Sequence, residues 1–384
     1  MELGKFIQQD NQQWDKYNAF IPNPFPPKGG FGFSESLIKQ DAKAQHLVSK
    51  LDGITQLIPD VDFFIFMYIL KDASSSSQIE GTRASMIDAI EAEANIGSDI
   101  PEDVDDIIHY IKALNNGIEV LKEVPISERL IKKLHKDLMQ GARYTQNPYP
   151  GEFRHDQNWI NGTSPRDAKF VPPPPHEISR VISDWEKFAH ANDNLLPLTK
   201  AALLHAQFET IHPFRDGNGR TGRMLTTLYL REAGLLEKPV LFLSSYFKKH
   251  QQVYYNRLNS YSDNEISEWV QFFLSGVSEI AGEAIETVYK ITKLRERDML
   301  KIQNMDKRSS KSAITVLPKL FALPIIDVTT IQKWTGFSRS GAQKLIDRFM
   351  GLGILNLRGI GKKYNRSYIY KDYVDIFYNT HKRE

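Results

Sequence analysis

The residues best suited to chemistry lie in one short segment from His212 to Arg223, HPFRDGNGRTGR. Histidine can accept a proton near neutral pH, so His212 is a candidate general base. A glycine loop that enters a helix exposes backbone N–H groups and the positive end of the helix dipole, which together bind anions. Arg220 and Arg223 lie three residues apart, and guanidinium groups bind phosphate oxygens bidentately. Asp216 beside bound phosphates is a natural ligand for Mg²⁺.

Two predicted helices must position this segment. Before it, Ala201, Leu204, Phe208 and Ile211 repeat at helical spacing, and a second helix after it is predicted to stop at Gly234. A His-Pro pair at a helix end and an Asp-Gly turn are each common structural features. Their combination with two arginines in register favours a functional site. His205, two turns before His212, is predicted to be a packed, hydrogen-bonded residue.

Composition limits the function. The chain has 384 residues, with 49 basic and 47 acidic side chains, so its net charge of +2 excludes a whole-chain nucleic-acid binder. Zero cysteines exclude disulfides, thiolate nucleophiles and cysteine zinc sites. The N-terminus lacks a signal peptide, and the longest apolar run, Phe63 to Leu70, is shorter than the ~20 residues of a membrane span. These features predict a cytoplasmic protein that does not enter a membrane.

The periodicity predicts a mainly helical chain with one long interruption. The first residues, to about Lys28, are expected to be an extended lead-in. Helical patterns cover Ser34 to Ala94 and resume after Val104. The interruption, at about 147–176, contains seven prolines, and its NWI and AKFV runs flank a turn signal typical of a hairpin. Loops this long are usually functional.

Two further segments have a distinctive composition. The serine run of Ser74 to Ser77 favours, by composition alone, a flexible loop. A charge-dense helix ends in RSSK, which is typical of a linker. From Thr329 onward there are 11 basic and 4 acidic residues, and the pattern of helix, glycine turn, helix and two strands resembles a winged helix.

The segment at 212–223, called the signature loop below, resembles the Fic domain signature H-x-F-x-[DE]-[GA]-N-[GK]-R-x-x-R at every specified position. The interruption resembles the flap of that family, a hairpin that covers the site and holds the target by strand addition. The resemblance implies a mainly α fold, with a Fic-type helical core, a β-hairpin flap and a small α+β winged helix. It divides the chain into residues 1–103, a core at 104–293, a helical linker at 294–311 and a winged helix at 312–384.

The resemblance implies transfer of AMP from ATP to a Tyr, Thr or Ser hydroxyl of a target protein, with the enzyme itself as a second target. His212 would be the general base, and Asp216 would hold Mg²⁺. Arg223 would bind the γ-phosphate. Glycine at position 219 favours AMP transfer, since related kinases tend to carry lysine there. The phosphate-binding residues implied are Gly217, Asn218, Gly219, Arg220, Gly222 and Arg223, and the target-binding flap residues are Asn161, Gly162 and Thr163.

With this family in view, Ser76, Glu80 and Gly81 match its inhibitory motif [ST]-x-x-x-E-[GN]. Residues four apart share a helix face, so a short helix is expected to place Glu80 on Arg223 and inhibit the enzyme in cis. Two alternatives stay open. One is a DNA-binding regulator that uses the site as a nucleotide sensor, and the other is a hydrolase that removes AMP. The winged helix would then bind DNA or a protein, and a homodimer is a further arrangement. The DNA contacts expected are Arg339, Lys344, Lys362 and Lys363.

Overall fold

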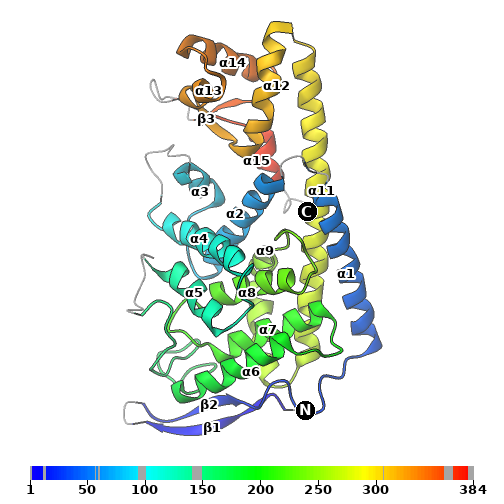
Figure 1. Ribbon diagram of the computed structural model, residues 1–384. Helices are drawn as coiled ribbons and strands as arrows, with labels where there is room; N and C mark the ends of the chain where they lie inside the picture. Colours follow the sequence, from blue (N-terminus) through cyan, green and yellow to red (C-terminus); the bar gives the residue numbers. More distant parts are fainter. Residues whose placement is uncertain are drawn as a thin grey trace.

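The computed structural model describes residues 2–11, 14–56, 58, 61–93, 101–140, 149–305, 307–358 and 366–378. The chain is mainly helical, with one long helix along the side of the molecule and the C-terminal elements stacked at one end (Figure 1). This confirms the predicted fold class. Within the described ranges, no helix is both long and apolar enough to cross a membrane.

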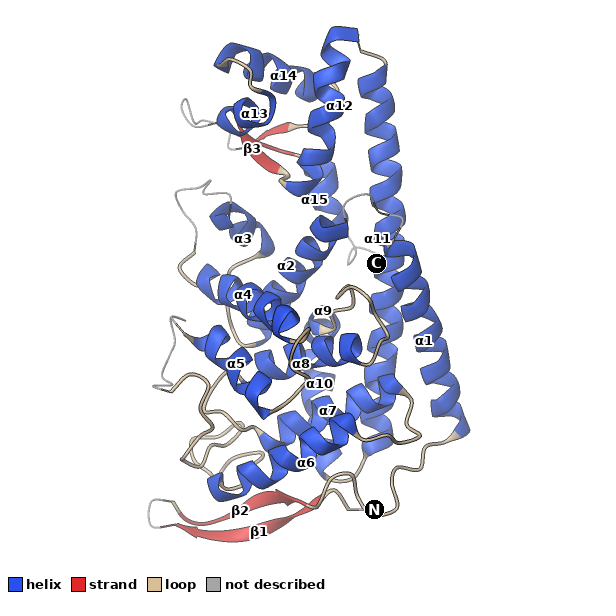
Figure 2. Ribbon diagram, in the orientation of Figure 1, coloured by secondary structure: helices blue, strands red, loops and turns tan. Residues whose placement is uncertain are grey.

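An N-terminal β-hairpin replaces the predicted extended lead-in. Strands β1 (Gly4–Asn11) and β2 (Asp15–Pro22) pair antiparallel, and they lie at the opposite end of the molecule from the C-terminal elements (Figure 2). The prediction was wrong because the prolines that suggested irregular chain begin only at Pro22, the last residue of β2. Position 4 requires glycine, since a Cβ there would lie 2.5 Å from the Ile21 carbonyl oxygen. The Phe20 N–H donates to the carbonyl of Val171 at 2.8 Å, so the hairpin is attached to the flap.

The serine run belongs to a long helix. Helix α2 (Val61–Ile79) continues through Ser74 to Ser77, which are buried, so both the flexible loop and the separate short helix were wrong. The helix ends at Ile79, and Gly81, with a φ of +100°, lets the Thr82 N–H donate to the Ser77 carbonyl at 3.1 Å. Tertiary packing therefore overrides a composition that favours a loop. The neighbouring helices are α1 (Glu35–Thr55), α3 (Met86–Glu93) and α4 (Val104–Val120).

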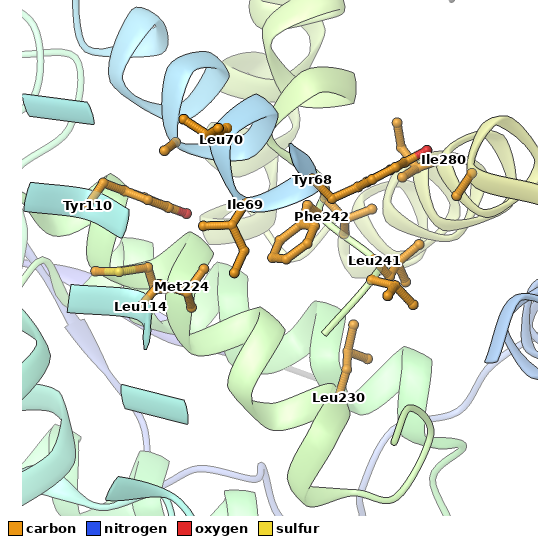
Figure 3. Close-up of a cluster of buried hydrophobic side chains, with 14 of the residues drawn as sticks. Tyr68, Ile69, Leu70, Tyr110, Leu114, Met224, Leu230, Leu241, Phe242 and Ile280 are labelled. Atoms are coloured by element: carbon orange, nitrogen blue, oxygen red, sulfur yellow. The ribbon is translucent and has the colours of Figure 1, made fainter. Parts of the chain in front are cut away.

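The middle of the chain is a bundle around two buried helices. Helices α7 (Pro197–Ile211) and α8 (Asn218–Glu232) are connected by the signature loop, and almost all of their residues are buried. Side chains of α2, α4, α8 and α11 meet in one core (Figure 3), so the helix that carries the inhibitory motif is packed into the same core as the site. The remaining elements are α5 (Glu128–Met139), the 3-10 helix η1 (Pro175–Glu177), α6 (Ile178–His190), α9 (Ser244–Lys249), α10 (Gln251–Ser262) and α11 (Ile266–Gln303).

The C-terminal elements follow the order expected of a winged helix, although membership of that class remains a prediction. Helix α13 (Val328–Thr335), the left-handed Gly336 and helix α14 (Arg339–Gly351) form the expected helix, turn and helix. The three short strands form an antiparallel sheet in the order β3-β5-β4. The other elements here are α12 (Lys307–Ala322), β3 (Ile325–Asp327), β4 (Asn356–Arg358), β5 (Ser367–Ile369) and α15 (Lys371–Tyr378).

The boundaries predicted for the helical linker fall within helices. Helix α11 runs through residue 294, and α12 contains the RSSK run and crosses residue 312. The segment at 294–311 is thus mostly helical, as predicted, and its role as a linker stays a prediction. The division into domains stays a prediction. The C-terminal elements also contact α2, since the ring of Phe377 on α15 lies 6.0 Å from that of Tyr68.

Candidate active site

The signature loop is held in shape by its own side chains. His212 caps α7 in a left-handed conformation with φ of 49°, and Gly217, with φ of 75°, begins α8 in the same conformation. The Asn218 side chain closes the loop, because its Oδ1 accepts from the Phe214 N–H and its Nδ2 donates to the Phe214 carbonyl, both at 2.8 Å. Both polar atoms of this amide are therefore engaged in the loop, and the backbone N–H of Asn218 at the start of α8 is the donor expected to contact a phosphate.

His212 is oriented as a base. Its Nδ1 donates to the Glu209 carbonyl at 3.2 Å, so the lone pair is on Nε2. Burial lowers the pKa of His212 to about 4, which keeps the ring neutral at pH 7. The buried Arg154 donates from Nε to the His212 carbonyl at 2.9 Å and so supports the strained backbone of this residue.

The residues expected to bind anions lie at the start of α8. Asp216 is about half exposed, and its Oδ1 accepts from the Gly217 N–H at 2.6 Å. Arg220 is buried between two carboxylates, 4.0 Å from Asp106 and 3.9 Å from Asp216. Its Nε has no hydrogen-bond partner in the described part of the chain, so this guanidinium has a free donor. Within those same ranges, no three His, Asp or Glu residues cluster to hold a metal, and the half-exposed carboxylate of Asp216 offers the oxygen donors that Mg²⁺ prefers.

Glu80 lies on Arg223, as the motif predicts. Arg223 donates from Nη2 to Glu80 Oε1 at 2.7 Å and from Nε to the Ser76 hydroxyl at 2.8 Å. Burial raises the pKa of Glu80, but the charge and the hydrogen bond of Arg223, together with the charge of Arg220, outweigh it, so the pKa of the carboxyl is held below its ordinary value. A Cβ at Gly219 would lie 2.5 Å from Glu80 Oε1, so glycine at this position leaves room for the carboxylate.

A cavity of about 370 Å³ joins these groups. His212, Asp216, Gly217, Asn218, Gly219, Arg223 and Glu80 line it, whereas Arg220 and Gly222 do not. Gly222 instead lies against Glu209, because a Cβ there would be 2.5 Å from Glu209 Oε1. Sequence reasoning missed several lining residues. The local signal available for any of them was closeness to the signature loop, which contains Arg215 and directly follows the Glu209–Ile211 segment. The missed residues are Trp159, Glu209, Thr210, Arg215, Tyr254, Tyr255, Leu258, Asn259 and Ser262.

The flap forms one bridge in place of a full hairpin. Ile160 and Phe170 pair antiparallel, with the Ile160 N–H donating to the Phe170 carbonyl at 2.9 Å. The pairing stops there because the four prolines after Val171 have no N–H to donate. Of the expected target-binding residues, Asn161 lines the cavity, while Gly162 and Thr163 form the turn beyond it. Thr163 is bonded to Asp167 through its N–H and its hydroxyl.

The remaining predicted residues lie away from the cavity. His205 is buried and bonded to Thr226 and Tyr254, which confirms its structural role. Arg339 and Lys344 are exposed on α14. Lys362 and Lys363 lie outside the described residues.

Two family matches cover much of the core. Residues 125–230 match the Fic/DOC family, and residues 38–119 match the N-terminal region of that family. The chain is 35% identical over 124 residues to a protein adenylyltransferase Fic of Culex quinquefasciatus, which covers 32% of this chain and 22% of the mosquito protein. It is 32% identical over 175 residues to a probable protein adenylyltransferase of Aquifex aeolicus, which covers 44% of this chain and 50% of that protein. The chain thus matches half or less of the length of these relatives.

Solved structures share the fold. A Fic family protein from Desulfovibrio desulfuricans aligns with a TM-score of 0.57 over 88% of this chain and 97% of its own, at 17% identity. A Fic domain containing signaling protein from Bacteroides thetaiotaomicron aligns with a TM-score of 0.52 over 64% of this chain and 97% of its own, at 20% identity.

Proposed function

The chain carries a Fic/DOC family domain at residues 125–230, and from this premise we propose that it transfers AMP from ATP to a hydroxyl side chain of a target protein. The observation that carries the proposal is the signature loop itself. It combines a neutral histidine with an open Nε2, a glycine-lined helix N-terminus and a buried arginine around one cavity. Phosphoryl-type transfer needs little more than positioning and neutralisation of charge.

In the proposed reaction, Nε2 of His212 takes the proton of the target hydroxyl. The hydroxyl oxygen forms a bond to the α-phosphorus, and the bond from that phosphorus to pyrophosphate breaks. The backbone N–H groups at the start of α8 face the phosphates. Arg220 does not line the cavity, and it adds positive charge from behind, 3.9 Å from Asp216. Asp216 is the residue that would hold Mg²⁺, which neutralises charge on the leaving pyrophosphate when it is bound. The aromatic residues Tyr254 and Tyr255, on the same cavity wall, suit a purine ring.

Glu80 is proposed to inhibit this reaction. It holds Arg223, the arginine proposed to bind the γ-phosphate, from the same chain. The carboxylate also lies over Gly219, where nucleotide phosphates would approach the start of α8. Both effects reduce productive ATP binding, and neither requires a second protein.

Intact-mass spectrometry tests the proposal. Purified Glu80→Gly protein, and a Glu80→Gly/His212→Ala control, are incubated with ATP and Mg²⁺ alone and with a cell extract from which modified proteins are recovered. Gain of one AMP on the enzyme or on an extract protein, absent with the control, supports AMP transfer. Gain of one phosphate, or no labelled protein in either incubation, contradicts it. Release of AMP from a protein labelled in this way would indicate the hydrolase alternative.

The C-terminal elements support a second, separate proposal of DNA binding. Arg339 and Lys344 are exposed on α14, the second helix of the helix-turn-helix pattern, where base or phosphate contacts are made in proteins of that kind. Binding to duplex DNA that weakens steeply with salt, and less steeply in an Arg339→Ala/Lys344→Ala variant, would support it. Absence of binding at low salt would exclude it and favour a protein partner.

A further inference from the structure

Glu209 is a buried carboxylate that the proposed reaction leaves without a role. The residue is 8% exposed and lines the cavity. Its Oε1 is buried and has no hydrogen-bond partner in the part of the chain that the structure describes. A buried carboxylate oxygen without a hydrogen-bond partner lowers the stability of the fold, so we expect Glu209 to serve a function at this place.

The side chain lies directly beside the proposed base. Glu209 is on the last turn of α7, and its Oε2 lies 4.0 Å from Nδ1 of His212. The backbone carbonyl of the same residue accepts the Nδ1 proton at 3.2 Å. The left-handed conformation of His212 folds its ring back over this turn. One residue therefore fixes the tautomer with its backbone and places a carboxylate behind the ring.

The surrounding charges set the state of this carboxylate. Burial raises the pKa of Glu209 to about 7, Arg223 opposes this shift, and Glu80 adds to it. The phenol of Tyr254 also faces Glu209, and Arg154 faces His212, where it lowers the pKa of the ring. When Glu80 leaves, Glu209 loses a negative neighbour, and the positive charge of Arg223 is no longer neutralised by Glu80. Both changes lower the pKa of Glu209, so the ionised carboxylate is favoured in the uninhibited enzyme. Because residue 222 is glycine, no Cβ occupies the space in which Glu209 Oε1 lies.

We propose that Glu209 is a positioning residue for His212: it holds the ring with Nε2 toward the cavity and stabilises the imidazolium that forms when the target hydroxyl gives up its proton. The inference rests on the proposed function of the signature loop. A carboxylate behind a histidine has this role in the Ser-His-Asp triad, where it stays ionised while the imidazole takes the proton. Here the contact is electrostatic at 4.0 Å, since the backbone carbonyl occupies Nδ1.

The test compares Glu209→Gln with Glu209→Asp, both in the Glu80→Gly background. Glutamine keeps the size of the side chain and removes its charge, while aspartate keeps the charge. We expect Glu209→Gln to lower kcat about tenfold or more at pH 8, where Glu209 is ionised, and to leave KM for ATP unchanged. This magnitude follows from the interaction of unit charges about 4 Å apart in a partly polar site. The substitution should also remove the fall in kcat that protonation of Glu209 causes in the parent at lower pH. Glu209→Asp should recover most of the rate.

A second measurement does not depend on transfer. The pKa of His212 is measured by NMR titration in nucleotide-free protein, with its signal assigned from the His212→Ala variant. We expect the His212 ring signals of the parent to shift as Glu209 ionises, at a higher pH than the protonation of the ring itself, and this step to be absent from Glu209→Gln. If Glu80→Gly transfers AMP but Glu209→Gln leaves kcat, its pH profile and the titration of the His212 signals unchanged, this inference is wrong and the proposed function stands. If Glu80→Gly transfers nothing, the proposed function fails, and the titration alone decides the electrostatic role.

Discussion

Replacement of Glu80 by glycine is expected to strengthen ATP binding by freeing Arg223. The bond between Arg223 Nη2 and Glu80 Oε1 is 2.7 Å long, and the Arg223 side chain is only 3% exposed. A charge-assisted hydrogen bond contributes about 1.5–3 kcal/mol. The Glu80 side chain is 38% exposed, so water screens it and the lower end of this range applies. We therefore expect about tenfold tighter ATP binding, because 1.4 kcal/mol corresponds to a factor of about ten.

The variant should keep Arg223 in place. Its Nε still donates to the Ser76 hydroxyl, and its Nη2 still donates to the Ser76 carbonyl at 3.1 Å. A Glu80→Gln variant separates charge from bulk. It keeps an oxygen acceptor over Gly219 but loses the ion pair, so its ATP affinity should lie between those of the wild type and Glu80→Gly.

Isothermal titration calorimetry with ATP and Mg²⁺ measures this affinity in a His212→Ala background, which prevents turnover. Initial rates of AMP incorporation, measured with His212 intact at low ATP, should rise by at least the same factor. Glu279→Gln is a matched control, since the Glu279 side chain is 34% exposed and pairs with Lys249 at 2.6 Å, on an element that does not line the cavity. An ATP affinity in Glu80→Gly within twofold of that of the wild type would refute the competition between Glu80 and the γ-phosphate.

Three further predictions follow from individual residues. His212→Ala should lower AMP transfer by about 10²–10⁴-fold while ATP still binds, as measured by initial rates and calorimetry, and a loss of only a few-fold would exclude a general base. Gly81→Ala should lower the free energy of unfolding by about 1 kcal/mol, because alanine must adopt a φ of +100° in otherwise open space. Gly282→Ala, in helix α11 with nothing within 4 Å of the added Cβ, should not lower it, and urea denaturation of both variants decides this. Burial lowers the pKa of His205 to about 3 and that of His135 to about 4, below the ordinary 6.5, so the unfolded chain binds these protons first. Their contribution to stability is complete above about pH 6.5 and falls by up to about 1.4 kcal/mol per pH unit for each histidine between pH 6.5 and 4, and urea midpoints that do not change over this range would contradict it.

The local chemistry of the site could be predicted from the sequence. The signature loop is a contiguous segment, and its glycines, histidine and arginines occur at fixed spacing between two strongly periodic helices. Such a segment folds in one way, since the helices on each side determine where its ends lie. Even the distant pair of Glu80 and Arg223 was predictable, but only through the family motif, because nothing in the serine run by itself indicates a helix.

Predictions failed where several distant elements decide the outcome. The serine run is helical because α2 packs into the core with α4, α8 and α11, and burial outweighs the low propensity of serine for helices. The flap pairs at only one bridge because the N-terminal hairpin takes the Val171 carbonyl and prolines follow it. The sequence pattern of the serine run does not reveal the helices that pack against it, and that of the flap does not reveal the N-terminal hairpin.

The sequence by itself determined the types of group at the site and their order along the loop, because contiguous residues need no long-range information to meet. Only the tertiary structure brought Glu209 beside His212 with an unpaired oxygen, placed Tyr254 and Tyr255 on the same cavity, and assigned the Asn218 amide to the loop itself. Burial also shifts the pKa values of two neighbouring groups in opposite directions, since it lowers the pKa of His212 and raises that of Glu209. Burial depends on how the whole chain packs, so the sequence of the loop does not reveal it.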